Sequence, residues 1–403
     1  MKPLNILQIV PSISLVYGGP SQMVRGLSAA LANQTVGDNA IAKVTILTTD
    51  SNGDVDELPL DVPLGMPVAE DGYEVIYFRC SPFRRYKFST QLLSWLWANA
   101  HHYDIAHIHA LFSPVSTAAA TVCRWRNLPY LMRPLGTLDP ADLEKKKQAK
   151  RLYASLLERP NLAGAAAIHF TTELESKVSE RFGVSTPDVV VPLGVALPEL
   201  PDRAASQAAI REQFGIPAER PIVLFMSRID PKKGFDLLLP ALEKLHRRNC
   251  PFHFLLCGAN PQDRAYETRI RQQIEASSWA SWATLNGFVS GELKAKILSA
   301  ADLFVLPSYY ENFGIAVAEA MAAKLPVVIS DQVHIWPTIQ ADAAGWVVPT
   351  EVEALTAALA EALVDAEARS LRGQNAQRCA KDHYSWQAIA QQMSQAYRQL
   401  LQA

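Results

Sequence analysis

The chain has 403 residues, of which 49% are hydrophobic, and its formal net charge is −2. A chain of this length fits two globular domains of roughly 200 residues each, and its composition excludes a disordered or fibrous protein. The nearly neutral charge argues against nucleic acid as a main partner, because proteins that bind a phosphate backbone usually carry a large basic excess.

The cysteines and the N-terminus indicate the compartment. The five cysteines are scattered and include no C-x-x-C pair, which favours buried thiols in a reducing compartment over disulfides or a zinc site. The N-terminal MKPLNILQIVPS has too short an apolar run for a signal peptide. No apolar stretch approaches the roughly 20 residues that span a bilayer. We therefore expect a cytoplasmic protein.

In the first half, short apolar segments alternate with helical patterns. The segments NILQIV, VTILTT, EVIYF, IAHIH, YLMR, AAIHFT and VVVPLG predict strands, and helices are predicted between most of them, at 19–32, 90–100, 114–126 and 141–157. This alternation is typical of a parallel sheet covered by helices. It predicts an N-terminal α/β domain over residues 1–193.

The pattern restarts after a linker. Residues 194–205 are polar and rich in proline, which predicts an interdomain linker. The segments IVLFMSR, FHFLLCG, ATLNGFV, LFVLPS, PVVIS and GWVVP then predict a second doubly wound domain over 206–383. A last helix, 384–403, is expected to pack back on the first domain. Ligands of such sheets bind at the carboxyl ends of the strands, so two facing sheets would place a site in the cleft between them.

Two glutamates in the second half, Glu311 and Glu319, lie in the segment YYENFGIAVAEAMA after the predicted strand LFVLPS. The helix expected from about Gly314 would present free N–H groups and a positive dipole end, which suit a diphosphate. Glu311, in the loop, could accept hydrogen bonds from sugar hydroxyls, and Glu319, inside the helix, could bind a ribose diol. The segment therefore predicts a nucleotide-sugar site, and the competing interpretation is a solvated helix with incidental acids.

This segment resembles the Glu-x7-Glu donor signature of glycosyltransferase family 4. The resemblance implies the GT-B fold, in which two Rossmann-like domains face each other across a cleft, and a transfer that retains the anomeric configuration. It assigns donor contacts to the residues that match the signature, which are Glu311, Asn312, Phe313, Gly314, Ile315 and Glu319.

The segment MSRIDPKKGFDLLL resembles the Arg/Lys element of the same family, with Arg228 and Lys233 at the matching positions. Two cations beside a departing diphosphate stabilise its charge without a metal, and the sequence has no clear Asp-x-Asp metal motif. We therefore expect neither a metal nor a cofactor. Lys232 is expected to be solvated. The resemblance also implies donor contacts at Gly19, in the first strand-to-helix loop, and at the backbone of Val289.

The predicted strand IAHIH places His107 and His109 on one face. His109 lies nearer the carboxyl end of the strand, so it is expected to point toward the cleft, and it matches a family position that lines the acceptor side. His107 is expected to be a core residue. Leu135 occupies the place of a histidine that contacts the donor sugar in many family members. Catalysis would then have to use the leaving phosphate as the base.

The segment DLEKKKQAKRLYASLLE is locally basic, and two interpretations of it are open. It is either a solvated helix face or a patch for anionic lipid headgroups at the inner membrane face. The basic residues are Lys145, Lys146, Lys147, Lys150 and Arg151.

The resemblance as a whole implies a retaining hexosyltransferase. Its donor would be a nucleotide diphosphate sugar, and its acceptor a growing glycan or a lipid-linked molecule in polysaccharide or lipopolysaccharide biosynthesis. Two alternatives remain: a catalytically silent GT-B subunit that binds a partner or glycan, which Leu135 favours, and a nucleotide-sugar epimerase of the same fold.

Overall fold

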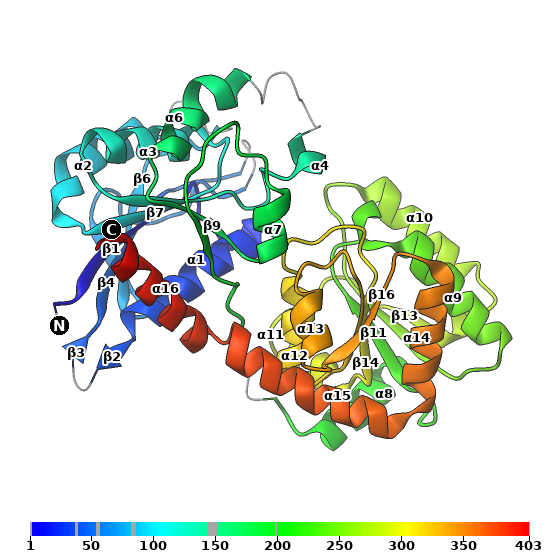
Figure 1. Ribbon diagram of the computed structural model, residues 1–403. Helices are drawn as coiled ribbons and strands as arrows, with labels where there is room; N and C mark the ends of the chain where they lie inside the picture. Colours follow the sequence, from blue (N-terminus) through cyan, green and yellow to red (C-terminus); the bar gives the residue numbers. More distant parts are fainter. Residues whose placement is uncertain are drawn as a thin grey trace. The chain divides into compact units, whose positions relative to one another are not determined.

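The computed structural model describes residues 2–36, 39–53, 57–81, 86–143, 152–197 and 200–402. The chain folds into two compact units (Figure 1). Unit 1 comprises Met1–Gly194 and Trp386–Ala403, and unit 2 comprises Val195–Ser385. The chain first passes from unit 1 to unit 2 after Gly194, at the start of the predicted linker. The first helix of unit 2 begins at Arg203, three residues before the predicted start of the second domain.

Unit 1 is built on an eight-stranded sheet with the order β10-β9-β8-β7-β1-β4-β6-β5. Neighbouring strands are parallel, except for β5 and β6, which are antiparallel. A separate small hairpin pairs β2 (Thr35–Val36) with β3 (Asn39–Ala40). The strands of the large sheet are β1 (Leu4–Ile9), β4 (Ala42–Thr49), β5 (Pro67–Glu70), β6 (Tyr73–Phe78), β7 (Ile105–His109), β8 (Tyr130–Arg133), β9 (Ala167–Phe170) and β10 (Asp188–Val190).

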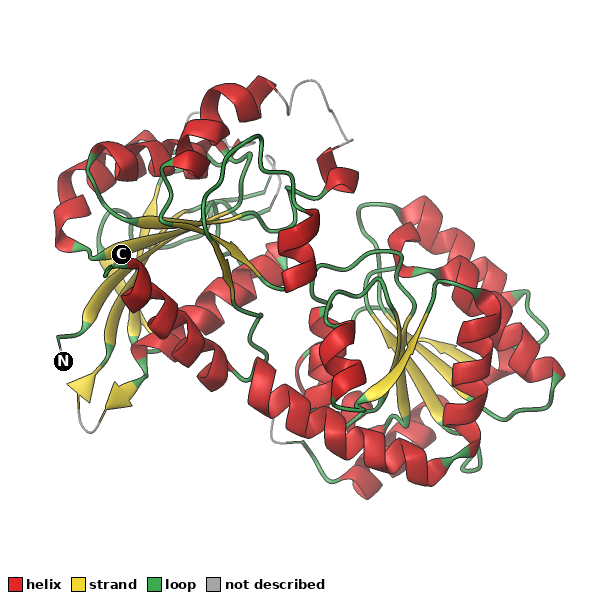
Figure 2. Cartoon of the chain, in the orientation of Figure 1, coloured by secondary structure: helices red, strands yellow, loops and turns green. Residues whose placement is uncertain are grey.

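Helices cover this sheet, as a parallel sheet with two apolar faces requires (Figure 2). Among them, α16 packs on α1. The Trp386 ring of α16 lies directly against Gly26 and Gly194. A Cβ atom added to Gly26 or Gly194 would meet that ring at 2.3 or 2.1 Å, so both positions need glycine. The helices of unit 1 are α1 (Gly19–Ala32), α2 (Thr90–Asn99), α3 (Pro114–Trp125), α4 (Pro140–Leu143), α6 (Arg159–Ala163), α7 (Glu173–Val178) and α16 (Trp386–Leu400), with a π-helical turn at Ala154–Glu158.

Unit 2 contains a six-stranded, entirely parallel sheet with the order β13-β12-β11-β14-β15-β16. Its strands are β11 (Ile222–Met226), β12 (His253–Cys257), β13 (Ala283–Leu285), β14 (Leu303–Leu306), β15 (Val327–Ser330) and β16 (Gly345–Val348). Its helices are α8 (Arg203–Phe214), α9 (Phe235–Arg247), α10 (Arg264–Glu275), α11 (Gly291–Ala300), α12 (Ile315–Ala322), α13 (Trp336–Ala341), α14 (Val352–Val364) and α15 (Ala366–Cys379), followed by a π-helical turn at Ala380–Tyr384.

Both sheets reverse their strand order once, and these reversals mark where ligands can bind. In unit 1 the chain runs outward from β1 to β4 on one side and from β7 to β8 on the other, so the switch point lies between β1 and β7. In unit 2 it lies between β11 and β14. The predicted fold class, α/β with two doubly wound sheets, is confirmed. At a switch point, the loops at the carboxyl ends of the strands diverge and leave a crevice.

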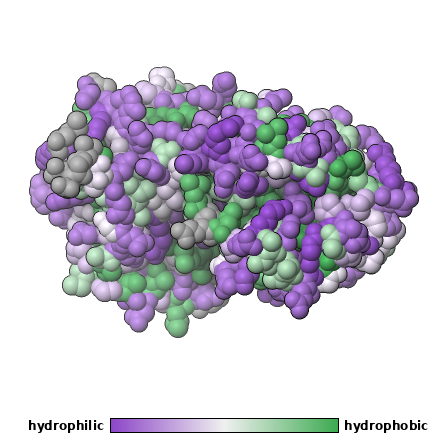
Figure 3. Space-filling view, turned by 90° about the horizontal axis from the view of Figure 1, so that it is seen from below, coloured by the Kyte–Doolittle hydropathy of each residue, from purple (hydrophilic) through white to green (hydrophobic). Residues whose placement is uncertain are grey.

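On the face shown in Figure 3, hydrophilic residues predominate and hydrophobic ones form separate groups. None of the helices in the described part of the chain combines the length and the apolar character that a membrane span requires.

Candidate functional site

The loops after β11 and β14 meet at the switch point of unit 2. Gly234, which ends the loop after β11, has a φ of +72°, and a Cβ atom there would lie 2.1 Å from the Pro307 carbonyl oxygen. Only glycine therefore allows the two loops to approach this closely. The backbone N–H of Tyr309 donates to the Lys232 carbonyl at 2.8 Å, which joins the loops a second time. The sheet thus brings the predicted Arg/Lys element beside the predicted Glu311 loop.

Lys233 and Glu311 form an ion pair across these loops, between Nζ and Oε1. Both side chains are largely buried, with 12% and 19% of their surface exposed. Burial, and next the neighbouring Arg228 charge, lower the pKa of Lys233 to about 8. The pair is therefore partly desolvated and lies at the carboxyl ends of the parallel strands. Charge interactions are stronger in such a site than in water.

Arg228 lies at the rim of the same site. Its side chain is exposed, and Nη1 donates a long hydrogen bond of 3.4 Å to Gln262 Oε1. The loop that carries it is fixed from behind, because Asn260 Nδ2 donates to the Ile229 carbonyl at 2.9 Å. Lys232, which we expected to be solvated, is half-buried, and its ammonium lies 5.5 Å from the centre of the Tyr310 ring.

Backbone contacts fix Glu311 in place. Its N–H donates to the Gln332 carbonyl at 3.1 Å, and its own carbonyl accepts from the His334 N–H at 2.9 Å. The segment after β15 therefore clamps the residue from the other side. This leaves the Glu311 carboxylate free to exchange Lys233 for another hydrogen-bond donor without a change of backbone.

The helix expected after Gly314 is α12, and it begins at Ile315. Gly314 has a φ of +82°, and no described side chain caps the helix. Because the first N–H groups of a helix lack partners within it, this end can bind an anion. Asn312 and Ile315 are half-buried around this turn, whereas Phe313 is buried.

Glu319 lies in the second turn of α12, as predicted, and its Oε1 is 2.7 Å from Lys294 Nζ of α11. The sequence analysis missed Lys294. Nothing local to the segment GELKAKILSA distinguishes this lysine from its neighbour Lys296, and only the packing of α11 beside α12 makes the pairing visible. Glu311 and Glu319 thus each form an ion pair with a lysine in the free protein.

The remaining unit 2 prediction concerns the loop after β13. Val289 is buried, and its predicted backbone contact with the donor stays a prediction. The neighbouring Phe288 is 79% exposed.

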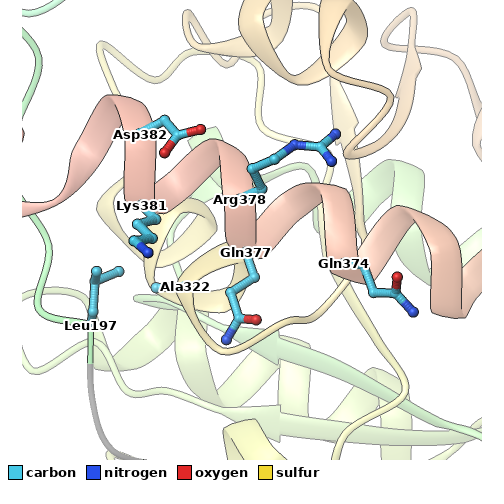
Figure 4. Close-up of a pocket in the computed structure, with 7 residues that line it drawn as sticks. All are labelled: Leu197, Ala322, Gln374, Gln377, Arg378, Lys381 and Asp382. Carbon is cyan, nitrogen blue, oxygen red and sulfur yellow. The ribbon is translucent and has the colours of Figure 1, made fainter.

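A separate surface pocket of about 610 Å³ on unit 2 is lined by α15 and contains none of the predicted site residues (Figure 4).

In unit 1, the loop after β1 carries the paired glycines. Gly18 has a φ of +70° and is the residue before helix α1, so the backbone requirement for glycine falls on Gly18. Gly19, to which the sequence analysis assigned a donor contact, is the half-buried first residue of α1. Its backbone N–H belongs to the open first turn of a 14-residue helix.

His109 is not where we expected it. It shares a face with His107, with ring centres 4.4 Å apart, but it is fully buried, and its Nε2 is bonded to Gln8 Oε1 at 2.7 Å. The expectation that it points into an open cleft is wrong, because both faces of the sheet are covered and the period of a strand does not distinguish a core face from a cleft. Within the described residues, its Nδ1 has no hydrogen-bond partner.

His109 is part of a buried polar network that the sequence analysis did not find. His107 Nδ1 is 2.8 Å from the Tyr397 hydroxyl of α16, and its Nε2 is 3.1 Å from His169 Nδ1. Burial, more than the neighbouring charges, lowers the pKa of His107 and of His109 well below the ordinary value, and that of His169 to about 3. The three imidazoles are therefore neutral. His107 is a core residue, as expected.

The loops around this network are strained. Ala110, Phe112 and Leu135 have positive φ angles of 71°, 57° and 59° although none is glycine. All three follow β7 or β8 at the carboxyl edge of the sheet. Arg133, at the end of β8, is buried with Nη1 2.8 Å from Met23 Sδ. Such backbone outliers cluster at ligand sites, so this edge remains a candidate binding edge without His109 at its surface.

The basic run from Lys145 to Arg151 lies outside the described residues. Just beyond it, Leu152, Leu156 and Leu157 are exposed, while Ala154 and Glu158 are buried. Three leucines that follow the basic run in the sequence therefore face the solvent.

Two family profiles match consecutive parts of the chain. A profile described as "Glycosyl transferase 4-like domain" matches residues 18–194, and one described as "Glycosyl transferases group 1" matches residues 206–379. Among curated relatives, the alpha-D-kanosaminyltransferase of Streptomyces kanamyceticus is 31% identical over 200 residues, which are 49% of this chain and 50% of that protein. The chain thus spans about half the length of the first curated relatives that it matches.

Solved structures match the whole chain. The sucrose-phosphate synthase of Thermosynechococcus elongatus is 25% identical with a TM-score of 0.74, and the match covers 99% of both chains. HepE of Anabaena, solved in complex with UDP and glucose, is 18% identical with a TM-score of 0.71 over 98% of this chain and 99% of that one. These likenesses support the GT-B fold.

Proposed function

Because this chain belongs to the family 4 type of glycosyltransferases, we propose that it transfers a hexose from a nucleotide diphosphate sugar to a glycan or lipid-linked acceptor. The observation that carries the proposal is the Lys233–Glu311 ion pair beside the open N-terminus of α12, at the switch point of unit 2. This arrangement places a cation, a hydroxyl-binding carboxylate and free N–H groups together, and a sugar diphosphate requires all three.

The ion pair suggests how the donor binds. In the free protein, Lys233 and Glu311 satisfy each other. A donor that enters between them would give Lys233 a phosphate oxygen and Glu311 a sugar hydroxyl, so neither charge loses its partner. Glu319 and Lys294 form a second such pair, which suits the ribose diol. The first turn of α12 would receive the diphosphate.

The reaction would proceed with retention and without a metal. The C1–O bond to the diphosphate breaks, its electron pair passes to the phosphate oxygen, and Arg228 and Lys233 stabilise the charge that develops. The acceptor hydroxyl attacks C1 on the same face of the sugar, and its proton passes to the departing phosphate oxygen. This route requires no histidine, which agrees with Leu135 in the place of the family histidine and with His109 held neutral in the core.

The acceptor is proposed to come from polysaccharide or lipopolysaccharide assembly at the inner membrane face. The exposed leucines that follow the basic run in the sequence support a peripheral contact, because exposed apolar side chains and nearby basic residues both favour binding to anionic lipid. Replacing Lys145, Lys146 and Lys147 with glutamine should release the protein from anionic vesicles. Unchanged co-sedimentation would contradict the membrane patch and leave the transferase proposal intact.

The test of the activity is a panel of nucleotide sugars. We expect one class of donor to be hydrolysed slowly without acceptor, at a rate that added Mg²⁺ or Mn²⁺ does not raise, and NMR of the transfer product to show the anomeric configuration of the donor. The matching nucleoside diphosphate at about 100 times its Kd should stabilise the fold by about 2.7 kcal/mol. An inverted product would overturn retention, and a rate that rises with added Mg²⁺ or Mn²⁺ would overturn metal independence.

A further inference from the structure

The ends of helices α13 and α15 bring together a cysteine, a histidine and an aspartate, far in sequence from the donor loops. Cys379 is the last residue of α15, His383 lies in the π-helical turn that follows, and Asp342 directly follows α13. Among the described residues, these three form a cluster whose ligand atoms all lie within 4.8 Å of one another. We propose that Asp342, Cys379 and His383 bind a zinc ion.

The ligand set favours zinc over the other common divalent ions. Thiolate, imidazole and carboxylate are the three side-chain ligands of Zn²⁺, whereas Mg²⁺ and Ca²⁺ prefer oxygen alone. Zinc at about 2.0–2.3 Å from its ligands in a tetrahedral site holds them about 3.3–3.8 Å apart. His383 Nε2 already lies 3.6 Å from Asp342 Oδ2. Small side-chain rotations would bring the three ligand atoms to these distances. A water molecule would occupy the fourth coordination position of the ion.

The surroundings suit an ion that enters from solvent. The His383 side chain is 49% exposed and that of Asp342 is half-buried, whereas Cys379 is buried. The open histidine gives the ion access, and the buried thiol gives it a desolvated ligand. Burial, and next the Asp342 carboxylate, raise the pKa of the Cys379 thiol. A bound ion would displace the proton of this thiol.

The same cluster lies next to the elements that contact residues 311–313 of the donor loop. Tyr384, the neighbour of His383, packs its ring edge-on against Phe313 with the centres 5.2 Å apart. The segment that leads into α13 donates the His334 N–H to the Glu311 carbonyl. An ion at the cluster would thus tie together the two elements that hold residues 311–313. It would act as a structural clip in unit 2, independently of any transferase activity.

Cobalt provides the test, because Co²⁺ replaces Zn²⁺ and its bond to a thiolate absorbs in the near ultraviolet. The full chain, stripped of metal with a chelator and dialysed, should bind one equivalent of Co²⁺ with this thiolate band, and Zn²⁺ should displace it. Cys379→Ser should abolish the band, and His383→Gln should weaken Co²⁺ binding about tenfold or more. Cys250→Ser, at a half-buried cysteine outside the cluster, is the matched control and should keep the spectrum.

Absence of a thiolate band, or a band that survives Cys379→Ser, would overturn the proposal. If Cys379→Ser does not fold, His383→Gln decides, because its side chain is half exposed and the variant should fold. Zn²⁺ should raise the thermal unfolding temperature of the parent protein and leave that of His383→Gln unchanged. An equal rise in both would also overturn the site.

Discussion

The strand order reverses in the same way in the two units, but the side chains at the two switch points differ in charge and in exposure. In unit 2 the loops after β11 and β14 carry Lys233, Glu311 and Arg228, which are charged and reach the surface at least in part. In unit 1 the strands β1 and β7 carry Gln8, His107 and His109, which are fully buried. The topology thus gives each unit one switch point, and the side chains decide which of the two presents charge to a ligand.

Burial acts on both sets of side chains but has different consequences. It lowers the pKa of Lys233 only to about 8, so this ammonium stays charged near neutral pH. It lowers the pKa of His109 well below the ordinary value, so this imidazole stays neutral. In the proposed reaction, the charge-stabilising role therefore falls to unit 2, and the histidines of unit 1 are neutral side chains in its core.

The largest expected effect is on turnover. Lys233→Ala and Arg228→Ala should each lower it by about 10² to 10³, because each removes a preorganised cation from the departing diphosphate. Lys232→Ala, one residue away and directed at the Tyr310 ring, should change it only a few-fold. Turnover within a few-fold of the parent for Lys233→Ala would remove unit 2's lysine from the reaction.

The two acids should divide the donor between them. A hydrogen bond to a charged group contributes about 1.5–3 kcal/mol, or roughly 10- to 100-fold. Glu319→Gln should weaken binding of the free nucleoside diphosphate by that factor, since Glu319 lies inside α12 near the proposed ribose site. Glu311→Gln should instead lower turnover of the sugar donor. Calorimetric titrations with nucleoside diphosphate that show equal losses would contradict this division.

A smaller effect is expected from pH. Because the pKa of Lys233 is lowered to about 8, its cation is lost as the pH rises through that value. The kcat/KM for the donor should then fall, approaching about tenfold per pH unit above pH 8. Lys233→Arg should remove this fall, since guanidinium stays protonated. A parent profile that stays flat well above pH 8 would show that this lysine does not control the rate.

The smallest effect on donor hydrolysis is expected in unit 1. His109→Ala leaves Gln8 Oε1 without its partner, so the free energy of unfolding should fall by about 1–3 kcal/mol. Donor hydrolysis should stay within a few-fold of the parent. His109→Gln, which can still donate to Gln8, should be the milder change. If His109→Ala abolishes hydrolysis while the protein stays folded, His109 has a catalytic role and the contrast between the units fails.

The sequence predicted the parts of the structure that local patterns determine. The β/α alternation, the strand before Glu311 and the helix after Gly314 all follow from apolar periodicity and glycine placement. The place of Lys233 beside Glu311 followed from the family resemblance, because the two residues are distant along the chain.

What the sequence could not predict depends on long-range packing. The period of β7 put His107 and His109 on one face, but whether that face meets a cleft or a helix layer depends on α16, whose Tyr397 bonds His107. Lys294 reaches Glu319 only because α11 packs near α12. Likewise, Asp342 meets Cys379 and His383 only where two helices end side by side.

The central claim is that the switch point of unit 2 binds and cleaves a nucleotide diphosphate sugar. The most direct measurement is donor hydrolysis across a panel of nucleotide sugars, with the parent protein and Lys233→Ala side by side. We predict that the parent releases nucleoside diphosphate from one donor class and that Lys233→Ala does so about 10² to 10³ times more slowly. A parent protein that neither binds nor cleaves any nucleotide sugar would contradict the claim.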